Sequence, residues 1–166
     1  MQNNETPPDK SCTPTQWWRP DVFEERADTL VRRADMVKSL RDFFDRRGYV
    51  EVDTPALQVS PGMEPQLTAF ETTLSTLGGE REAVYLHTSP EFAMKKLLAA
   101  GMQRIFQLAR VFRDRERSAQ HHPEFTMLEW YCAGASWRDL AEEAVDLVRA
   151  SCGPVVRRGE VSCDLT

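Results

Sequence analysis

Two apolar segments separated by a long charged loop constrain the fold of this chain more than any other feature of its sequence. Residues 104–112 and 124–131 are rich in apolar and aromatic side chains, and the segment 113–123 between them is charged and polar. Apolar runs of this length on either side of a polar segment are typical of neighbouring strands joined by a loop. The sequence therefore predicts an antiparallel hairpin over residues 104–131.

A long segment near the start of the chain has the apolar spacing of an amphipathic helix. Residues 21–47 contain no glycine or proline, and their apolar side chains recur at the three- and four-residue steps of one helix face. Gly48 follows the basic pair Arg46 and Arg47, a combination that is typical of helix ends. The apolar stripe of this predicted helix consists of Leu30, Val31, Ala34, Val37, Leu40, Phe43 and Phe44.

Two further helices are predicted from the residues at their starts. Ser89 supplies a capping hydroxyl, Pro90 suits the first helical position, and Glu91 adds a negative charge to the first turn. Ser136 and Asp139 have the spacing of a capping box ahead of another apolar stripe. We therefore expect helices to begin near residues 90 and 137.

Shorter strands complete the predicted fold. The patterns of residues 49–53, 67–73 and 83–87 predict strands, and the prolines and glycine within residues 56–66 predict a loop. Strands and helices in this order indicate an α+β fold, in which an antiparallel sheet is flanked by helices.

The composition of the chain excludes several classes of protein. The 166 residues carry a formal net charge of −5, which argues against non-specific coating of nucleic acid. The sequence has neither a run that is apolar enough for a transmembrane helix nor the apolar region of a secretory signal. We therefore expect a cytoplasmic protein with a disordered arm at residues 1–16 and a folded domain at residues 17–166. Its cysteines lack metal-ligand spacing, so they predict no metal site.

The second strand of the predicted hairpin places an unusual set of side chains on one face. Because side chains alternate along a strand, Phe125, Met127, Glu129 and Tyr131 share that face. The preceding loop begins with Arg113, whose planar guanidinium suits two phosphate oxygens at once. A ring that can stack on a base and a carboxylate that can hold an ammonium group complete the set. These residues indicate positioning and charge stabilisation, as nucleotidyl transfer requires, and form no nucleophile–base pair.

Ordinary structural roles also account for each of these residues. A run of arginines and acids between two strands is common in solvated hairpin loops, and the adjacent His121 and His122 also fit a polar loop. Glu91 at a helix start is favoured by the helix dipole alone. Residue chemistry by itself therefore leaves both a binding surface and a solvated loop open.

Three motifs, in the same order along the chain, resemble the catalytic domain of class II aminoacyl-tRNA synthetases, in particular its lysine-type branch. RRGYVEVDTPAL at 46–57 resembles the first motif of that class, and YLHTSPEFAMKKLLAAG at 85–101 resembles the segment that contacts the amino acid. FRDRERSAQHHPEFTMLEWY at 112–131 resembles the second motif. Within the class, HHPEFTMLEWY and SPGMEP are similar to the elongation factor P lysine ligases, paralogues of lysyl-tRNA synthetase.

On the ATP side of the site, the resemblance implies a role for each candidate residue. Arg113 would bridge the α-phosphate of ATP and the carboxylate of the substrate, His121 would face the β- and γ-phosphates, and Phe125 would stack on adenine. The lysyl enzymes have a glutamate two residues after the motif arginine, where this chain has Arg115. The ATP contact of that glutamate is therefore expected at Glu116 or not at all.

On the amino-acid side, the resemblance implies three further roles. Glu91 would hold the α-amino group of the substrate, and Glu129 and Tyr131 would reach the ammonium group of its side chain. A buried carboxylate without a cation costs several kcal/mol, which gives a preference for lysine a physical cause. The resemblance also implies Mg²⁺, with its main protein ligands in a part of the family domain that this sequence does not contain.

The third, glycine-rich motif of the family is not found in the sequence. None of the eight glycines forms a G-x-G pattern, and the resemblance covers about residues 20–150. We therefore expect an incomplete class II domain, and we expect the 166 residues by themselves to form no measurable adenylate.

The resemblance implies an activity for the full protein. It would activate lysine or β-lysine with ATP and Mg²⁺, transfer the acyl group to a lysine side chain of elongation factor P, and form a homodimer through the first motif. Two alternatives stay open: a fragment of a lysyl-tRNA synthetase, and a non-catalytic module for dimerisation or nucleotide binding. The first is less favoured because only about 20 residues precede the first helix, too few for an anticodon-binding barrel, so tRNA is not an expected partner.

Overall fold

The computed structural model of the protein describes residue 16 and residues 18–60, 62–152, 155–158 and 161–164. By its internal contacts the chain divides into the residues up to Ser39 and those from Leu40 onward, and helix α1 (Pro20–Asp45) crosses this boundary. The predicted disordered arm lies outside the described residues, except for Gln16.

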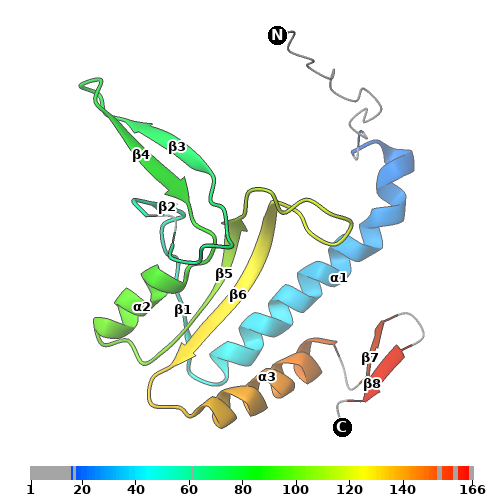
Figure 1. The fold of residues 1–166 in the computed structure, drawn as a ribbon. Helices are drawn as coiled ribbons and strands as arrows, with labels where there is room; N and C mark the ends of the chain where they lie inside the picture. The colour runs from blue at the N-terminus through cyan, green and yellow to red at the C-terminus, as the bar shows by residue number, and fades with distance from the viewer. Residues whose placement is uncertain (1–15, 17, 61, 153–154, 159–160, 165–166) are drawn as a thin grey trace. The chain divides into compact units, whose positions relative to one another are not determined.

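The predicted hairpin is the main sheet element of the part from Leu40 onward (Figure 1). Strands β5 (Arg104–Phe112) and β6 (Glu124–Cys132) pair antiparallel over their whole length, so their bounds match the sequence prediction to within one residue. Strand β1 (Val50–Glu51) joins β5 in parallel. The prediction of an antiparallel sheet is wrong for β1, because a parallel partner is reached through a long connection and leaves no turn signal in the sequence.

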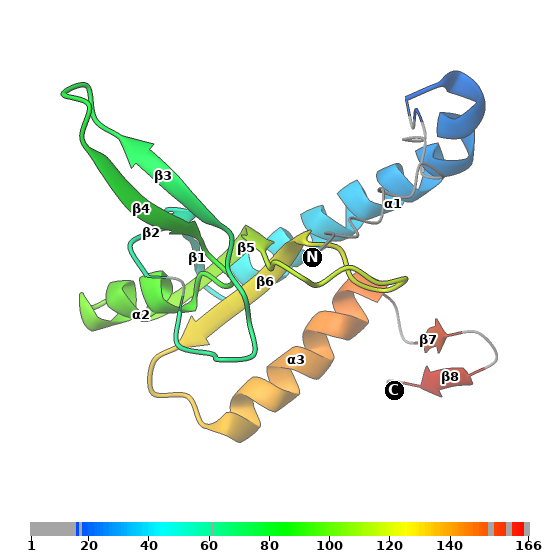
Figure 2. The ribbon, with the colours of Figure 1, turned by 45° about the horizontal axis from the view of Figure 1, so that its top comes forward.

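A second sheet has strand β4 (Arg81–Leu86) in its middle, between β2 (Leu57–Gln58) and β3 (Glu71–Ser75). Strand β3 begins at Glu71 instead of residue 67 and pairs antiparallel with β4, from Glu71 opposite Tyr85 to Ser75 opposite Arg81 (Figure 2). Strand β2 lies within the predicted loop 56–66, since its pairing with β4 is not a local property of the sequence.

The predicted helices form with small shifts in their bounds. Helix α1 ends shortly before Gly48, which has a φ of 73°, and helix α2 (Glu91–Ala99) begins one residue later than predicted. Helix α3 (Trp137–Cys152) has the predicted capping box. The backbone N–H of Ser136 donates to Asp139 Oδ2 at 2.7 Å, and that of Asp139 donates to Ser136 Oγ at 3.2 Å.

A small hairpin of β7 (Val155–Arg158) and β8 (Val161–Asp164) follows α3. None of the helices formed by the described residues combines the length and the apolar character that a membrane span requires.

One face of the β5–β6 pair packs on an aromatic core. The ring of Phe44 is fully buried, stacks on Phe106 at 4.5 Å between centroids and meets Tyr49 edge-on at 5.1 Å. Helix α3 lies on this side of the pair and α2 on the other (Figures 1 and 2). The cluster consists of Phe43, Phe44, Tyr49, Phe106 and Leu147, with Leu40, Leu128, Trp130 and Cys132 packed against it.

A carboxylate at the edge of this core joins α3 to the sheet. Glu143 Oε2 accepts hydrogen bonds from the hydroxyl of Tyr49 at 2.7 Å and from Trp130 Nε1 at 3.1 Å. Burial, followed by the hydrogen bond to Glu143, raises the pKa of Tyr49. The polar groups at this side of the core are therefore paired with each other.

The predicted apolar stripe of α1 is buried only near its end. Phe43 and Phe44 belong to the core, whereas Leu30 and Val31 are 45% and 61% exposed in the single chain. The stripe thus belongs to the core from Leu40 onward, is partly exposed at Val37 and is exposed at Leu30 and Val31.

We expect Phe44→Ala to lower the free energy of unfolding by about 3–5 kcal/mol, because the substitution leaves a cavity among packed rings. Leu74→Ala is the control, since Leu74 is half-exposed on β3 and its loss should change the free energy by less than about 1 kcal/mol. Urea unfolding followed by circular dichroism measures both. Equal losses of unfolding free energy in the two variants would show that the packing of Phe44 does not stabilise the fold more than a half-exposed side chain does.

Candidate functional site

The segment between β4 and α2 is tied to the end of β5. His87 Nε2 donates to the carbonyl of Arg110 at 2.6 Å, and the carbonyl of His87 accepts from the backbone N–H of Phe112 at 3.1 Å. Arg113 Nε donates to the carbonyl of Thr88 at 3.3 Å. These bonds fix the start of α2 beside the strand end from which the arginine-rich loop leaves.

One half of the site is a group of hydroxyls and carboxylates around Ser89. Its hydroxyl donates to Glu129 Oε2 at 2.7 Å and accepts from the backbone N–H of Glu91 at 3.1 Å. The hydroxyl of Tyr131 donates to Glu129 Oε1, the other oxygen of that carboxylate. The structure therefore joins Glu91, Glu129 and Tyr131, three residues predicted for the amino-acid side.

The phenol of Tyr131 is held in its protonated form. Burial raises its pKa most, the hydrogen bond to the carboxylate of Glu129 raises it further, and the negative charges of Glu129 and Glu91 add to the effect. Tyr131 is thus a donor to Glu129 and leaves the negative charge of the pair on the carboxylate.

The other half of the site is centred on Arg113. Its guanidinium lies 5.2 Å from the ring centroid of Phe125 and 3.8 Å from the carboxylate of Glu116. The side chain is only 21% exposed, so its three partners hold it in one orientation. Arg113, Glu116 and Phe125, all predicted for the ATP side, are therefore brought together.

Both halves lie on the face of β6 that is turned away from the aromatic core. Phe125 and Glu129 alternate with the core residues Leu128 and Trp130, and four residues of strand separate the ring from the carboxylate by about 13 Å. Gln107 of β5 stands opposite Glu129 in the register, is 4% exposed and accepts a hydrogen bond from Thr54 at 2.9 Å. The sheet thus sets the distance between a cationic end and an anionic end.

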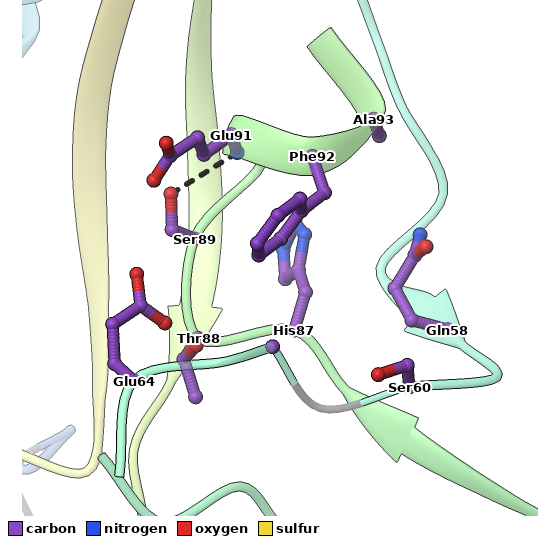
Figure 3. Close-up of a pocket in the computed structure, with 10 residues that line it drawn as sticks. Gln58, Ser60, Glu64, His87, Thr88, Ser89, Glu91, Phe92 and Ala93 are labelled. Atoms are coloured by element: carbon purple, nitrogen blue, oxygen red, sulfur yellow. Dashed lines mark hydrogen bonds between the residues drawn. The ribbon is translucent and has the colours of Figure 1, made fainter. Parts of the chain in front are cut away.

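A small pocket opens beside the carboxylate group (Figure 3). The polar ends of Glu64, Ser89 and Glu91 lie on the side of this pocket toward the sheet, and the exposed ring of Phe92 lies in front of the buried ring of His87. Glu64 comes from the loop after Gly62, where φ is 109°. A Cβ atom at Gly62 would come within 3.1 Å of Glu64 Oε2, so glycine leaves room for this carboxylate.

His121 is not brought to the other candidates. It lies in the exposed loop between β5 and β6, where its Nδ1 forms a hydrogen bond with Ser118 Oγ at 2.9 Å. Within the described residues no contact joins it to Arg113 or Phe125, and its contact with phosphate stays a prediction.

Three residues of the site were missed by the sequence analysis. Ser89 was assigned only to the helix start, although its hydroxyl also reaches Glu129. Lys95, one turn after Glu91 on α2, forms a salt bridge with it, and the i, i+4 spacing was the available signal. Glu64 had no signal, since nothing in a loop sequence indicates which pocket the loop will line.

The chain matches a known protein family. Residues 18–163 match the family described as class II tRNA synthetases (D, K and N). The chain belongs to this family. The resemblance inferred from its three motifs is thereby confirmed.

The chain is also similar to individual ligases. It is 41% identical over 141 residues to the elongation factor P–(R)-β-lysine ligase of Haemophilus ducreyi, an alignment that covers 83% of this chain and 42% of the relative. It is 41% identical to the Vibrio vulnificus ligase of the same name (84% and 43%), and 42% identical to that of Pasteurella multocida (80% and 40%). The chain thus spans about two fifths of the length of these relatives.

Magnesium is the cofactor that membership of this class implies. Over the described ranges, which run from residue 16 to residue 164 with gaps, no three His, Cys, Asp or Glu side chains are grouped so that they could hold a metal ion. These residues do not by themselves fit a Mg²⁺ site of this synthetase family, and the cofactor stays a prediction.

We expect Tyr131 to ionise at a higher pH in the folded protein than in urea, where a tyrosine titrates near about pH 10. Since a raised pKa in the folded state means that the unfolded state loses this proton first, stability should be unaffected below about pH 10 and fall as the pH rises above it. Ultraviolet difference titration of the protein and of Tyr131→Phe isolates the signal of this phenol. In Glu129→Gln, Tyr131 should titrate closer to its usual range, and an unchanged titration would contradict the role given to Glu129.

Proposed function

We propose that the protein activates lysine or β-lysine with ATP as an aminoacyl adenylate and transfers the acyl group to a lysine side chain of elongation factor P. Its similarity to ligases of that name supports the proposal. The observation that carries it is the arrangement along β6, where a guanidinium and a ring stand at one end and a carboxylate with two hydroxyl donors stands at the other.

The first step needs a positive charge where the two reactants meet. An oxygen of the amino-acid carboxylate attacks the α-phosphorus of ATP, and the bond to pyrophosphate breaks. Both reactants are anions, so negative charge gathers on the α-phosphate as they approach. Arg113 offsets this charge, and the carbonyl of Thr88 and the ring of Phe125 already hold its guanidinium in place.

The second step uses the energy of the mixed anhydride. The neutral amine of a lysine side chain on elongation factor P attacks the acyl carbon, an amide bond forms, and AMP leaves with the bonding electrons and is set free. One proton is released from the attacking amine. This proton passes to bulk water.

The preference for lysine follows from the other end of β6. Glu129 accepts hydrogen bonds from Ser89 and Tyr131, neither of which neutralises its charge. A cationic side chain about 13 Å along the strand from the adenine ring would supply the missing positive charge. Glu91 would hold the second amino group, as the family resemblance implies.

Other parts of the proposal concern the assembly and its surroundings. A homodimer through the first motif would cover the apolar stripe of α1 that is exposed before Leu40. Glu116 would be the counter-ion of Arg113 until phosphate arrives, and the contact of His121 with the leaving pyrophosphate belongs to the same proposal. We also propose that the reaction requires Mg²⁺ and that the protein is located in the cytoplasm.

We expect Arg113→Ala to lower ATP–pyrophosphate exchange, in protein expressed from the complete gene, by about 100-fold or more, because a preorganised charge is lost from the transition state. Arg110→Ala is the matched control: Arg110 lies on β5, three residues before Arg113, faces the other side of the sheet and forms an exposed ion pair with Glu124. Its exchange rate should stay within about two-fold of wild type.

Normal exchange by Arg113→Ala would remove this residue from the reaction. The acceptor is tested separately, by offering labelled lysine or β-lysine together with elongation factor P or with tRNA. Label on the factor supports the proposal, and label on tRNA alone would assign the protein to the lysyl-tRNA synthetases instead.

A further inference from the structure

Three carboxylates from three different segments surround the start of α2. Glu91 belongs to the helix itself, Glu129 to β6, and Glu64 to the loop that follows Gly62. Glu64 and Glu91 line one pocket with Ser89, whose hydroxyl also binds Glu129 (Figure 3). The fold therefore concentrates negative charge in a partly buried place, which is favourable only if cations share it.

The cation that already shares it is Lys95. Its ammonium group forms a salt bridge with Glu91, one helical turn before it. The hydrogen bond and charge of Glu91 raise the pKa of Lys95, and the charges of Glu129 and Glu64 raise it further. Lys95 is therefore charged and lies within the field of all three acids. It balances only one of them.

The position of Lys95 allows it to leave. Its side chain is 54% exposed, and an exposed pair at this helical spacing contributes little to stability, because water solvates both partners once they separate. The long aliphatic stem can carry the ammonium group into solvent while the backbone of α2 stays in place.

We propose that Lys95 is a resident counter-ion of the amino-acid site. Its ammonium group pairs with the carboxylate of Glu91 until an amino group of the substrate takes its place. This inference rests on the proposed function, in which Glu91 binds that amino group. The exchange conserves charge, since one ammonium ion leaves Glu91 as another arrives. Without Lys95 none of the three carboxylates would have a cationic partner among the residues that the structure describes, and Lys95 competes with the substrate for one of them.

Removal of the competitor should strengthen binding of the substrate. In Lys95→Met, which keeps most of the stem and loses the charge, we expect the Kd for lysine or β-lysine to fall by about two- to five-fold, the range that corresponds to an exposed ion pair. Lys96→Met is the matched control, because Lys96 is the next residue of the same helix and is also exposed. It loses the same charge without the contact to Glu91, and its Kd should not change.

A second measurement follows Lys95 itself in protein from the complete gene labelled with [ε-¹³C]lysine. Its resonance, assigned with Lys95→Arg, should move toward the position of a solvated lysine side chain as unlabelled lysine or β-lysine is added, and that of Lys96 should stay in place. This readout needs no turnover. If Lys95 responds while ATP–pyrophosphate exchange is absent, the adenylate function fails and the inference about Lys95 stands.

Two results would overturn the inference. One is a Kd in Lys95→Met that equals or exceeds that of Lys96→Met, because Lys95 would then not compete for the site. The other is a Lys95 resonance that stays in place at amino-acid concentrations that saturate binding. Failure of both lysine and β-lysine to bind, which would also leave the resonance in place, counts equally against the inference. Where the amino acid does bind, adenylate formation with either result would leave the proposed function intact and reject Lys95 as its counter-ion.

Discussion

The pairing of β5 with β6 is the constraint on which the rest of the structure depends. Nine residues of each strand are paired in one register, so every side chain of the pair is committed to one of two faces. Phe106 and Trp130 face the ring of Phe44, and this leaves Phe125 and Glu129 on the other face. A slip by one residue would bury the carboxylate in the aromatic core and expose the core residues, so the stability of the core also fixes the position of the site.

The two ends of the site differ in charge because different segments reach this face at different positions along β6. The loop after β5 supplies Arg113 near the ring of Phe125, and the segment before α2 supplies Ser89 near Glu129. Positive and negative ends are thereby held apart on a rigid strand. A substrate with a phosphoryl group at one end and an ammonium group at the other matches this arrangement.

The sequence was sufficient for those features that depend on local patterns. The bounds of β5 and β6 follow from two apolar runs on either side of a polar segment, and the shared face of Phe125 and Glu129 follows from two-residue alternation. The capping box of α3 follows from Ser136 and Asp139. Features that depend on distant partners could not be predicted in this way. The parallel pairing of β1, the short strand β2 and the place of Glu64 in the pocket are set by the packing of segments far apart in the sequence.

The most direct test of this account is a crystal structure of the protein, expressed from its complete gene, with a non-hydrolysable analogue of lysyl adenylate. We expect the adenine to stack on Phe125, the phosphate mimic to contact Arg113, and the ammonium group of the lysine side chain to bind Glu129. A bound analogue on the opposite face of β5 and β6, or one on this face that leaves Arg113 and Glu129 without contacts, would contradict the account.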